Sequence, residues 1–533
     1  MKLKKLRSSP MEGETTGQTS WRAEFLELLG PKQRATLANP RVPYDSSVEK
    51  CYRGRTVLLT GSTGFIGKCV LIKLLRVCKE VGQVILLIRK APSLTAQERF
   101  EHICLSTPFA ELRKETPEWR ELVQNKVRVI QGDLVKEDWD FSAAQILSLK
   151  KEVDIFINCS GRKDLDDDIH SMFKSNVDGP LSLLKFAKEC EKNVKFVHLS
   201  STQVASSMAC CTEAAETVSN LSDYMNEDPA KVVEVLHSSR VHAGGVKRKV
   251  KKMRGSFPNN YCFSMACAEV LLARNKGRVD LSIVRGSSVT AALAEPVPGW
   301  IENAAGLSEV IDLAFRGELM GIECPENCHW NLIPVDYVVN AIMAGALPTF
   351  CDISSEPVVY HACTKHPPPL KLILDTVRKV QDHSEVLQTT FFRPKIKTTH
   401  GKWKMGMEMT SKAVKRGLES LVGARGVKEV SRSMAMTVKS LKTTEEINKQ
   451  IHHFSHNEWD FQVSNAISLQ QSLVPEEQKM FPLDSTQLSW FTYIRQTCLG
   501  TSKFLLNSVD ITASLEESFN ELREEIESEW QSL

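Results

Sequence analysis

The sequence lacks a continuous apolar run long enough to cross a lipid bilayer. A membrane-spanning helix needs about 20 apolar residues in succession, and no segment of the 533 residues reaches that length. The basic residues at 1–10 are followed by no apolar segment of the kind that a secretory signal peptide requires. We therefore expect an intracellular protein without a transmembrane helix, in the cytoplasm or peripheral on an organelle membrane such as that of the peroxisome or endoplasmic reticulum.

Paired cysteine motifs are also absent. The fifteen cysteines are scattered without CxxC spacing, so free thiols in a reducing compartment are expected rather than a disulfide framework. The cluster of Cys324, Cys328 and His329 comes closest to a metal site, but a closed site needs further ligands at regular spacing. We predict an ordinary loop there and no metal.

The sequence has no large excess of charge of either sign. Its formal net charge of +3 offers no general attraction for nucleic acid. With 42% hydrophobic and 25% charged residues, the composition is that of a globular protein with a buried core. The length favours one large and one smaller domain.

Short apolar runs alternate with helix-length segments up to about residue 365. Strands that alternate with helices predict an α/β fold with a doubly wound parallel sheet of the Rossmann type. The expected strands are Val57–Leu59, Val84–Ile88, Val127–Ile130, Val153–Ile157, Val194–Leu199 and Leu281–Val284.

A glycine-rich turn follows the first expected strand. Glycines between a strand and a helix permit a tight turn and let backbone N–H groups approach a pyrophosphate at the helix N-terminus. Because the pattern lies inside a strand–helix–strand series, we predict a bound dinucleotide rather than a turn without a ligand. The predicted contacts are Thr60, Gly61, Thr63, Gly64, Phe65, Ile66 and Gly67.

The end of the second expected strand indicates which dinucleotide binds. An NAD enzyme carries Asp or Glu there for the ribose hydroxyls, whereas this chain has Arg89 and Lys90. These cations can pair with a 2′-phosphate, so NADPH is the predicted cofactor; a solvated arginine would leave the preference open. Asp133 and Leu134, after the third strand, are expected near the adenine.

Several passages resemble the fatty acyl-CoA reductase family, a branch of the extended short-chain dehydrogenases, from residue 51 to about 506. The passages at 295–303 and 331–346 separate this family from sugar-nucleotide epimerases and dehydratases, which share the nucleotide-binding half. The passages are VLLTGSTGFIGK at 57–68, KVRVIQGDL at 126–134, NCSGRKDLDDDIHSMFKSNVDGP at 158–180, PNNYCFSMACAEVLL at 258–272, EPVPGWIEN at 295–303, NLIPVDYVVNAIMAGA at 331–346, WDFQVSNAISLQ at 459–470 and LSWFTYIRQTCLGTSKFLL at 488–506.

The resemblance implies hydride delivery from NADPH to a long-chain acyl-CoA, which gives an aldehyde and then a primary fatty alcohol. Each delivery places negative charge on the former carbonyl oxygen, which hydroxyl donors must stabilise. Ser201 matches the family's hydroxyl position, with Thr202 beside it, and Tyr261 matches its catalytic acid. Taken alone, such a Ser and Tyr would more often be a helix cap and a core residue.

The chain departs from the family at Met265, where the resemblance implies the lysine that holds the cofactor ribose and lowers the tyrosine pKa. A thioether supplies neither service. An unperturbed phenol with a pKa of ~10 is still protonated at neutral pH, so reduction stays possible. The alternative is a catalytically impaired relative that binds NADP(H) or acyl-CoA as a sensor or scaffold. Gly286 and Gln203 also differ from the usual family residues.

A basic run lies at residues 247–254, just before the tyrosine segment. A solvated loop is the ordinary interpretation. The alternatives are a contact with the phosphates of coenzyme A, peripheral contact with an anionic membrane, or a nuclear address.

The domain organisation predicted from these patterns has four parts. Residues 1–50 form a disordered leader with at most one short helix, and residues 51–365 form the NADP-binding Rossmann reductase domain. Residues 366–450 form a linker or irregular segment because strand patterns fade there. Residues 451–533 form a smaller, mainly helical C-terminal domain that ends in an acidic amphipathic tail.

Overall fold

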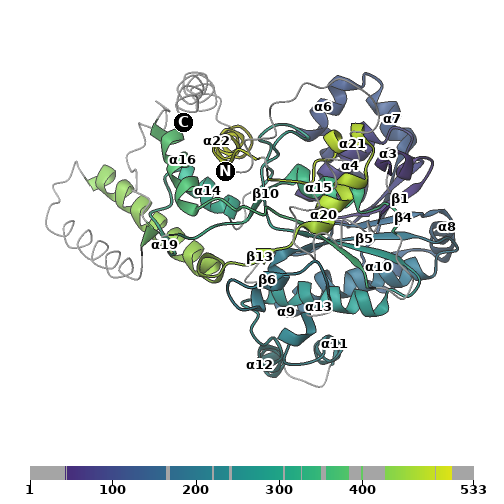
Figure 1. The fold of residues 1–533 in the computed structure, drawn as a ribbon, viewed down its shortest axis with the longest axis horizontal. Helices are drawn as coiled ribbons and strands as arrows, with labels where there is room; N and C mark the ends of the chain where they lie inside the picture. The colour runs from purple at the N-terminus through teal and green to yellow at the C-terminus, as the bar shows by residue number, and fades with distance from the viewer. Residues whose placement is uncertain are drawn as a thin grey trace, which may run out of the picture.

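A seven-stranded parallel sheet lies at the centre of the protein (Figure 1). Its strands, in chain order, are β1 Thr56–Thr60, β2 Gln83–Ile88, β3 Val127–Gln131, β4 Ile155–Asn158, β5 Lys195–Ser201, β7 Asp280–Gly286 and β11 Val358–Ala362. The computed structural model describes residues 42–43, 45–163, 168–218, 221–238, 243–303, 307–325, 327–349, 356–382, 398–399, 427–486 and 488–506.

The strand order is β11-β7-β5-β4-β1-β2-β3, and every pairing in this sheet is parallel. The chain therefore winds outward from β1 in one direction and then returns to wind outward from β4 in the other. This reversal is the topological switch point, where ligands bind in doubly wound sheets. The predicted α/β Rossmann fold is confirmed, although β11 was not predicted.

Helices cover both faces of the sheet, which explains why its strands read as nearly continuous apolar runs. In β1, Val57 and Leu59 belong to one buried cluster and Leu58 to the opposite one, because successive side chains of a strand point to opposite faces. On the first face lie α4 (Phe65–Val77) and α15 (Val335–Ala344). On the second lie α10 (Gly179–Lys188) and α13 (Asn260–Asn275).

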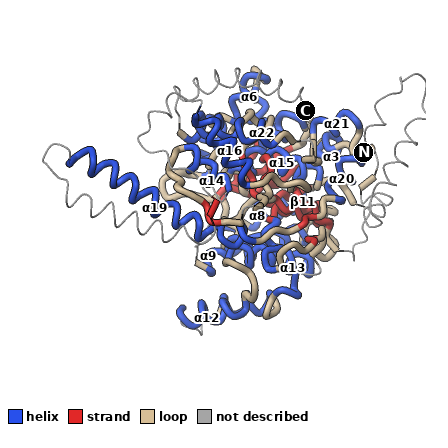
Figure 2. Tube along the Cα trace, turned by 60° about the vertical axis from the view of Figure 1, so that its left-hand side comes forward, coloured by secondary structure: helices blue, strands red, loops and turns tan. Residues whose placement is uncertain are grey.

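Shorter elements surround this centre, as Figure 2 shows from another side. The remaining named helices are α3 Val48–Tyr52, α5 Ala96–Leu105, α6 Pro108–Glu115, α7 Trp119–Lys126, α8 Ala143–Glu152, α9 Ile169–Phe173, α11 Pro229–His237, α12 Ala243–Met253, α14 Leu307–Phe315, α16 Leu370–Asp382, α19 Val427–His456, α20 Ser464–Ser472, α21 Pro475–Met480 and α22 Trp490–Gly500. The short strand pairs are β8 Ser288–Thr290 with β10 Leu332–Pro334, β9 Ile322–Glu323 with β12 Thr398–Thr399, and β6 Glu213–Ala214 with β13 Asp460–Phe461.

The second lobe is helical. Helices α14, α16 and α22 share a buried cluster that also receives Ile447 and Ile451 from α19. The prediction of an irregular segment at residues 366–450 is therefore wrong in two places, since that range holds α16 and most of α19. Apolar residues recur in α16 at helical spacing and pack this helix against α14 and α22. They are Leu370, Ile373, Leu374 and Val377.

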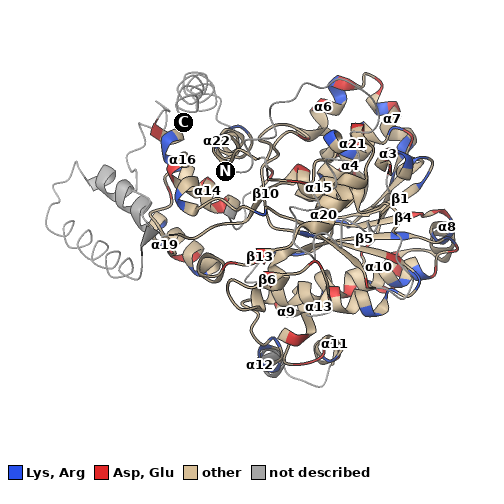
Figure 3. Ribbon diagram, viewed as in Figure 1, with Lys and Arg blue, Asp and Glu red and all other residues tan. Residues whose placement is uncertain are grey.

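Two further predictions need correction. The basic run at 247–254 is not a loop: it forms the end of α12, which projects from the sheet domain (Figures 1 and 2). In the predicted leader, α3 already begins at Val48, whereas residues 1–41 and the acidic tail after residue 506 lie outside the described residues. Elsewhere basic and acidic residues are interspersed over outer helices such as α6, α7 and α8 (Figure 3).

The last part of the chain returns to the sheet domain. The Glu477 carboxylate accepts hydrogen bonds from the backbone N–H groups of Val48 and Glu49, at 2.5 and 3.2 Å, and from the hydroxyl of Ser47. It thereby satisfies the free N–H groups at the start of α3. Over the described residues, no helix is both long and apolar enough to span a membrane.

Candidate active site

The glycine turn after β1 can be built only with glycines at two of its positions. Gly61 has a φ of +73°, and a Cβ there would lie 2.5 Å from the carbonyl carbon of Cys159. A Cβ on Gly67 would lie 2.2 Å from the carbonyl oxygen of Gly61. The turn therefore lies directly against both α4 and the end of β4. Gly64 precedes α4 without a side-chain cap, which leaves N–H groups of the first helical turn free for an anion.

A cleft of about 270 Å³ opens above this turn. It brings together seven of the predicted cofactor residues: Thr60, Gly61, Thr63, Gly64, Arg89, Asp133 and Leu134.

Four predicted cofactor residues do not line the cleft. Phe65 packs against the ring of Trp300, with the centroids 5.0 Å apart, and Ile66 packs on the core of the first face. Gly67 supports the turn from behind, and Lys90 points to the surface. These residues directly follow the turn or the strand in sequence. They do not reach the cleft because successive side chains of a helix or a strand point in different directions.

The cleft also contains residues that the sequence did not single out, namely Arg99, Ser160, Gly161, Ser175 and Gly179. Arg99 lies in the first turns of α5 and donates hydrogen bonds to the hydroxyl of Thr63, at 3.0 Å, and to the carbonyl of Arg89, at 2.6 Å. Partial burial and the nearby Arg89 charge lower the pKa of Arg99. The Thr95 and Glu98 capping box at the start of α5 could have identified this helical turn beside the strand end.

A buried polar network joins the ends of β1 and β4 to the middle of β5 beneath the turn. The hydroxyls of Thr60 and Ser160 each donate to the Oδ1 atom of Asn158 at 2.6 Å. The Asn158 amide donates to Nδ1 of His198 at 3.0 Å. Burial lowers the pKa of His198 to about 4, so its ring is neutral at physiological pH and can accept this bond.

Ser201 and Tyr261 meet at the carboxyl end of β5. Ser201 is the buried last residue of that strand, and Tyr261 lies in the first turn of α13, which Asn259 caps through the N–H of Cys262. The Ser201 hydroxyl lies close enough to Tyr261 to stabilise the charged form of the phenol. Burial raises the pKa of Tyr261 to about 12, and the nearby Ser201 hydroxyl opposes this rise. The phenol is therefore protonated across the physiological range and can serve as an acid.

Met265 lies one helical turn after Tyr261 and is only 7% exposed, within the apolar cluster of the second face. The neighbouring Ser264 receives a hydrogen bond from the buried amide of Asn176, at 3.1 Å, which also accepts from the N–H of Arg162 at 2.7 Å. Asn176 thus connects the loop that follows β4 to α13. The sequence reasoning missed this residue because its partners are distant in the chain.

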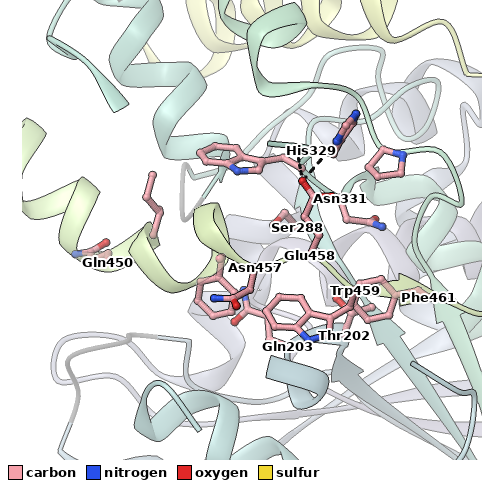
Figure 4. A pocket seen from close by; sticks show the side chains of 14 residues that line it. Thr202, Gln203, Ser288, His329, Asn331, Gln450, Asn457, Glu458, Trp459 and Phe461 are labelled. Atoms are coloured by element: carbon pink, nitrogen blue, oxygen red, sulfur yellow. Dashed lines mark hydrogen bonds and ion pairs between the residues drawn. The ribbon is translucent and has the colours of Figure 1, made fainter. Parts of the chain in front are cut away.

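A second cavity, of about 150 Å³, lies between the sheet and the second lobe (Figure 4). Aromatic and aliphatic side chains make up much of its wall, and the backbone N–H of His329 donates to the Glu458 carboxylate at 2.7 Å. Its lining residues are Thr202, Gln203, Ser288, His329, Trp330, Asn331, Pro367, Gln450, Ile451, Phe454, Asn457, Glu458, Trp459 and Phe461.

The two cavities lie at the same edge of the sheet. Strands β4 and β5 are neighbours, so Ser160, which lines the dinucleotide cleft, lies past the end of one strand, and Thr202, which lines the second cavity, lies past the end of the other. Ser201 directly precedes Thr202 in this arrangement. Few signals in the sequence could have identified the second cavity, because its lining residues come from five separate segments of the chain.

A Rossmann sheet, a glycine turn fitted to a dinucleotide and a paired serine and tyrosine define an oxidoreductase that uses a nicotinamide cofactor. A family model described as male sterility protein matches residues 59–342, and a second model of the same description matches residues 421–508. The chain belongs to this family, which is that of the fatty acyl-CoA reductases.

Curated relatives agree with this assignment, and solved structures agree with the fold. Fatty acyl-CoA reductase 1 of Homo sapiens is 29% identical over 472 residues, and fatty acyl-CoA reductase 2 of Bos taurus is 26% identical over 474 residues, each match covering 86% of both chains. The reductase domain of a nonribosomal peptide synthetase from Mycobacterium tuberculosis has a TM-score of 0.54 at 18% identity, over 90% of this chain and 97% of that one. The terminal reductase domain of the myxalamid pathway has a TM-score of 0.53 at 14% identity, over 92% and 97%. At these identities the two structures support the fold alone.

Proposed function

We propose that this protein reduces long-chain fatty acyl-CoA with NADPH, first to the aldehyde and then to the primary alcohol, for lipids of the wax or ether type. One observation carries the proposal. The hydroxyl pair of Ser201 and Tyr261 lies at the sheet edge that the dinucleotide cleft and the partly apolar second cavity share. Relatives named fatty acyl-CoA reductase along most of the chain support the substrate class.

The choice of NADPH over NADH rests on two guanidinium groups. Arg89 and Arg99 both line the cleft at the end of β2, where a carboxylate would be needed for an unphosphorylated ribose. Arginine binds phosphate through paired N–H donors, so two arginines suit a 2′-phosphate. The bond from Arg99 to Thr63 also links this position to the glycine turn.

When bound, the nicotinamide ring supplies the hydride. The residues of the chain have the complementary task of stabilising and protonating the substrate oxygen. Ser201 and Tyr261 both donate hydrogen bonds to the carbonyl oxygen, and these bonds strengthen as negative charge develops there. Tyr261, protonated because of its raised pKa, then gives its proton to that oxygen. Loss of the coenzyme A thiol leaves the aldehyde, and the same donors act again in the second reduction.

The acyl chain is assigned to the second cavity. Phe454 and Ile451 of α19 and Trp459 and Phe461 near β13 offer it apolar contacts. Gln203 and Thr202 lie at the side of the cavity that adjoins Ser201, which suits the polar thioester. An amphiphilic cavity of this kind accommodates a chain with one polar end.

The alternative function is that of an impaired relative which binds NADP(H) or acyl-CoA as a sensor or scaffold. Its support is Met265, whose side chain packs in the apolar core and offers no donor to a ribose. The deciding experiment incubates purified protein with NADPH and palmitoyl-CoA and measures aldehyde and alcohol by mass spectrometry. Product that disappears in Tyr261→Phe supports the reductase. Binding of NADPH or palmitoyl-CoA without product supports the alternative, and absence of binding of both ligands contradicts both functions.

A further inference from the structure

Cys210 and Cys211 are adjacent in sequence and both exposed. The other cysteines that the structure describes are buried, except for Cys159, which is half-buried. The Sγ atoms of Cys210 and Cys211 are 3.4 Å apart. This turn therefore presents a solvent-accessible dithiol, which has a chemistry that a single exposed thiol lacks.

The backbone of this turn is strained. Cys211 has a φ of +62°, a left-handed conformation that residues with a side chain rarely adopt and that costs on the order of 1–3 kcal/mol. Tertiary contacts hold it in place. The N–H of Cys211 donates to the carbonyl of Glu458 at 2.7 Å, and the N–H of Glu458 donates to the Sγ atom of Cys210 at 3.4 Å.

These contacts connect the dithiol to the second cavity. Glu458 and Trp459 line that cavity, and the indole N–H of Trp459 donates to the carbonyl of Met208, at 3.4 Å, in the same turn. Directly after the cysteines, β6 pairs with β13, which includes the lining residue Phe461. Movement of the dithiol turn therefore acts on the cavity wall through hydrogen bonds at both of its ends.

We propose that Cys210 and Cys211 are an oxidation site that a small disulfide such as oxidised glutathione converts to a vicinal disulfide, and that this bond alters the wall of the second cavity. The formation of the bond is independent of the function proposed above, whereas its effect on acyl-CoA reduction rests on that function.

The reaction balances without a further reagent. The thiolate of Cys210 attacks one sulfur of oxidised glutathione, forms a mixed disulfide and releases one glutathione thiolate. Cys211 then loses its proton to solvent, attacks the Cys210 sulfur and releases the second glutathione thiolate. The two thiols lose two electrons and two protons in total, and oxidised glutathione is reduced to two glutathione molecules.

The order of attack follows from the hydrogen bond between the sulfurs. This bond and the charge of a Cys210 thiolate raise the pKa of the Cys211 thiol, so Cys211 keeps its proton while Cys210 reacts. The product is easily reduced. Neighbouring Cα atoms lie about 3.8 Å apart, whereas unstrained disulfides need about 4.4–6.8 Å, and strained bonds are the more reducible ones.

Closing the bond brings the sulfurs from 3.4 Å to about 2.05 Å. The peptide between the cysteines must turn, which moves the N–H of Cys211 away from the carbonyl of Glu458. A shift on the order of 1 Å in a substrate site costs up to ~100-fold in rate. We expect oxidation to raise the KM for palmitoyl-CoA about 10-fold and to leave NADPH affinity unchanged.

The test uses the full chain in a Cys351→Ser background, because Cys351 lies outside the described residues. After oxidised glutathione and then iodoacetamide, the peptide that holds both cysteines is analysed by mass spectrometry. The expected result is a loss of two hydrogen atoms without alkylation, reversed by dithiothreitol. Cys211→Ser is the matched control, since its Cys210 should stop at the mixed disulfide with glutathione. Free alkylation of both cysteines, or pairing with any other cysteine, would overturn the oxidation site.

The kinetic arm compares the oxidised and the reduced protein. A rise in KM for palmitoyl-CoA that dithiothreitol reverses, and that is absent in Cys210→Ser and Cys211→Ser, supports the link to the cavity. An unchanged KM in protein shown to carry the disulfide would overturn that link. If the protein reduces no acyl-CoA, the peptide masses still decide whether the disulfide forms.

Discussion

Restoring the lysine that the family implies tests how much Met265 limits catalysis. Met265 follows Tyr261 by four residues on α13, a spacing that places two side chains on the same face of a helix. Met265→Lys therefore brings an ammonium group next to a phenol whose pKa burial has raised to about 12. The new charge favours the phenolate and makes Tyr261 a stronger acid.

The magnitude follows from charge and burial. A cation within about 4–6 Å shifts a pKa by about 1–3 units, and each unit corresponds to about 1.4 kcal/mol. If roughly half of that is expressed in proton transfer, kcat/KM rises about 3- to 30-fold, and more if the ammonium also reaches the cofactor ribose. Met265 is only 7% exposed, so the buried lysine costs about 2–4 kcal/mol of stability.

The assay measures kcat/KM for palmitoyl-CoA and NADPH together with the thermal midpoint of unfolding. Met265→Leu is the matched control, because it keeps the volume and the apolar packing and should change stability by less than about 1.5 kcal/mol. An unchanged rate in Met265→Lys, in protein that is folded and binds NADPH, would refute the idea that the missing lysine limits turnover.

Four further outcomes follow from the geometry of the site. Arg99→Leu should raise the Kd for NADPH about 10- to 100-fold and leave the Kd for NADH unchanged, since charge-assisted hydrogen bonds contribute about 1.5–3 kcal/mol. Calorimetry measures both Kd values, with Arg120→Leu on the exposed face of α7 as the control. An equal loss of affinity for both cofactors would contradict this prediction. Gly67→Ala should abolish binding of either cofactor, because its Cβ would lie 2.2 Å from the Gly61 carbonyl oxygen; retained affinity would show that the turn can relax. The rate of acyl-CoA reduction should show no alkaline loss from Tyr261 up to about pH 10, because its pKa is about 12, and a fall near pH 8 in a pH–rate profile would identify another acid. Burial raises the pKa of Glu216 from 4.5 to about 7, so the stability linked to its protonation is present below about pH 4.5 and is lost as the pH rises through 7. The free energy of unfolding, measured with denaturant, should fall by about 3 kcal/mol between pH 5 and 8 in the wild type and by much less in Glu216→Gln. Equal pH dependence in both proteins would contradict the raised pKa.

The parts of the site that the sequence predicted are those that local chemistry specifies. The turn at Gly61 and Gly67 follows from strand, glycine and helix in immediate succession, and its backbone contacts leave no room for other residues. Arg89 could be predicted because it ends a strand whose position in the fold is known. The same reasoning also predicted Lys90 as a cofactor contact, but Lys90 does not line the cleft. Local sequence does not determine which of two adjacent side chains faces a cleft.

The parts that could not be predicted depend on packing between distant segments. Arg99 reaches the cleft only because α5 folds back over the end of β2. Asn176 connects the loop after β4 with α13. The second cavity needs α19, which was predicted to be a linker because the segment is rich in Lys, Met and Thr. Strand β11 was missed because its apolar run is interrupted by His361, which the protein buries and bonds to Arg285.

The capping of α3 by Glu477 has a practical consequence for anyone who wishes to divide this chain. A fragment that stops near residue 365 would leave the N–H groups of Val48 and Glu49 without their acceptor and would uncover the sheet face under α20. Chimeras that exchange the helical part for that of a relative should therefore keep the glutamate and its serine partner, Ser47, as a unit. Shortened forms of the chain should likewise keep residues 47–49 and Glu477 together.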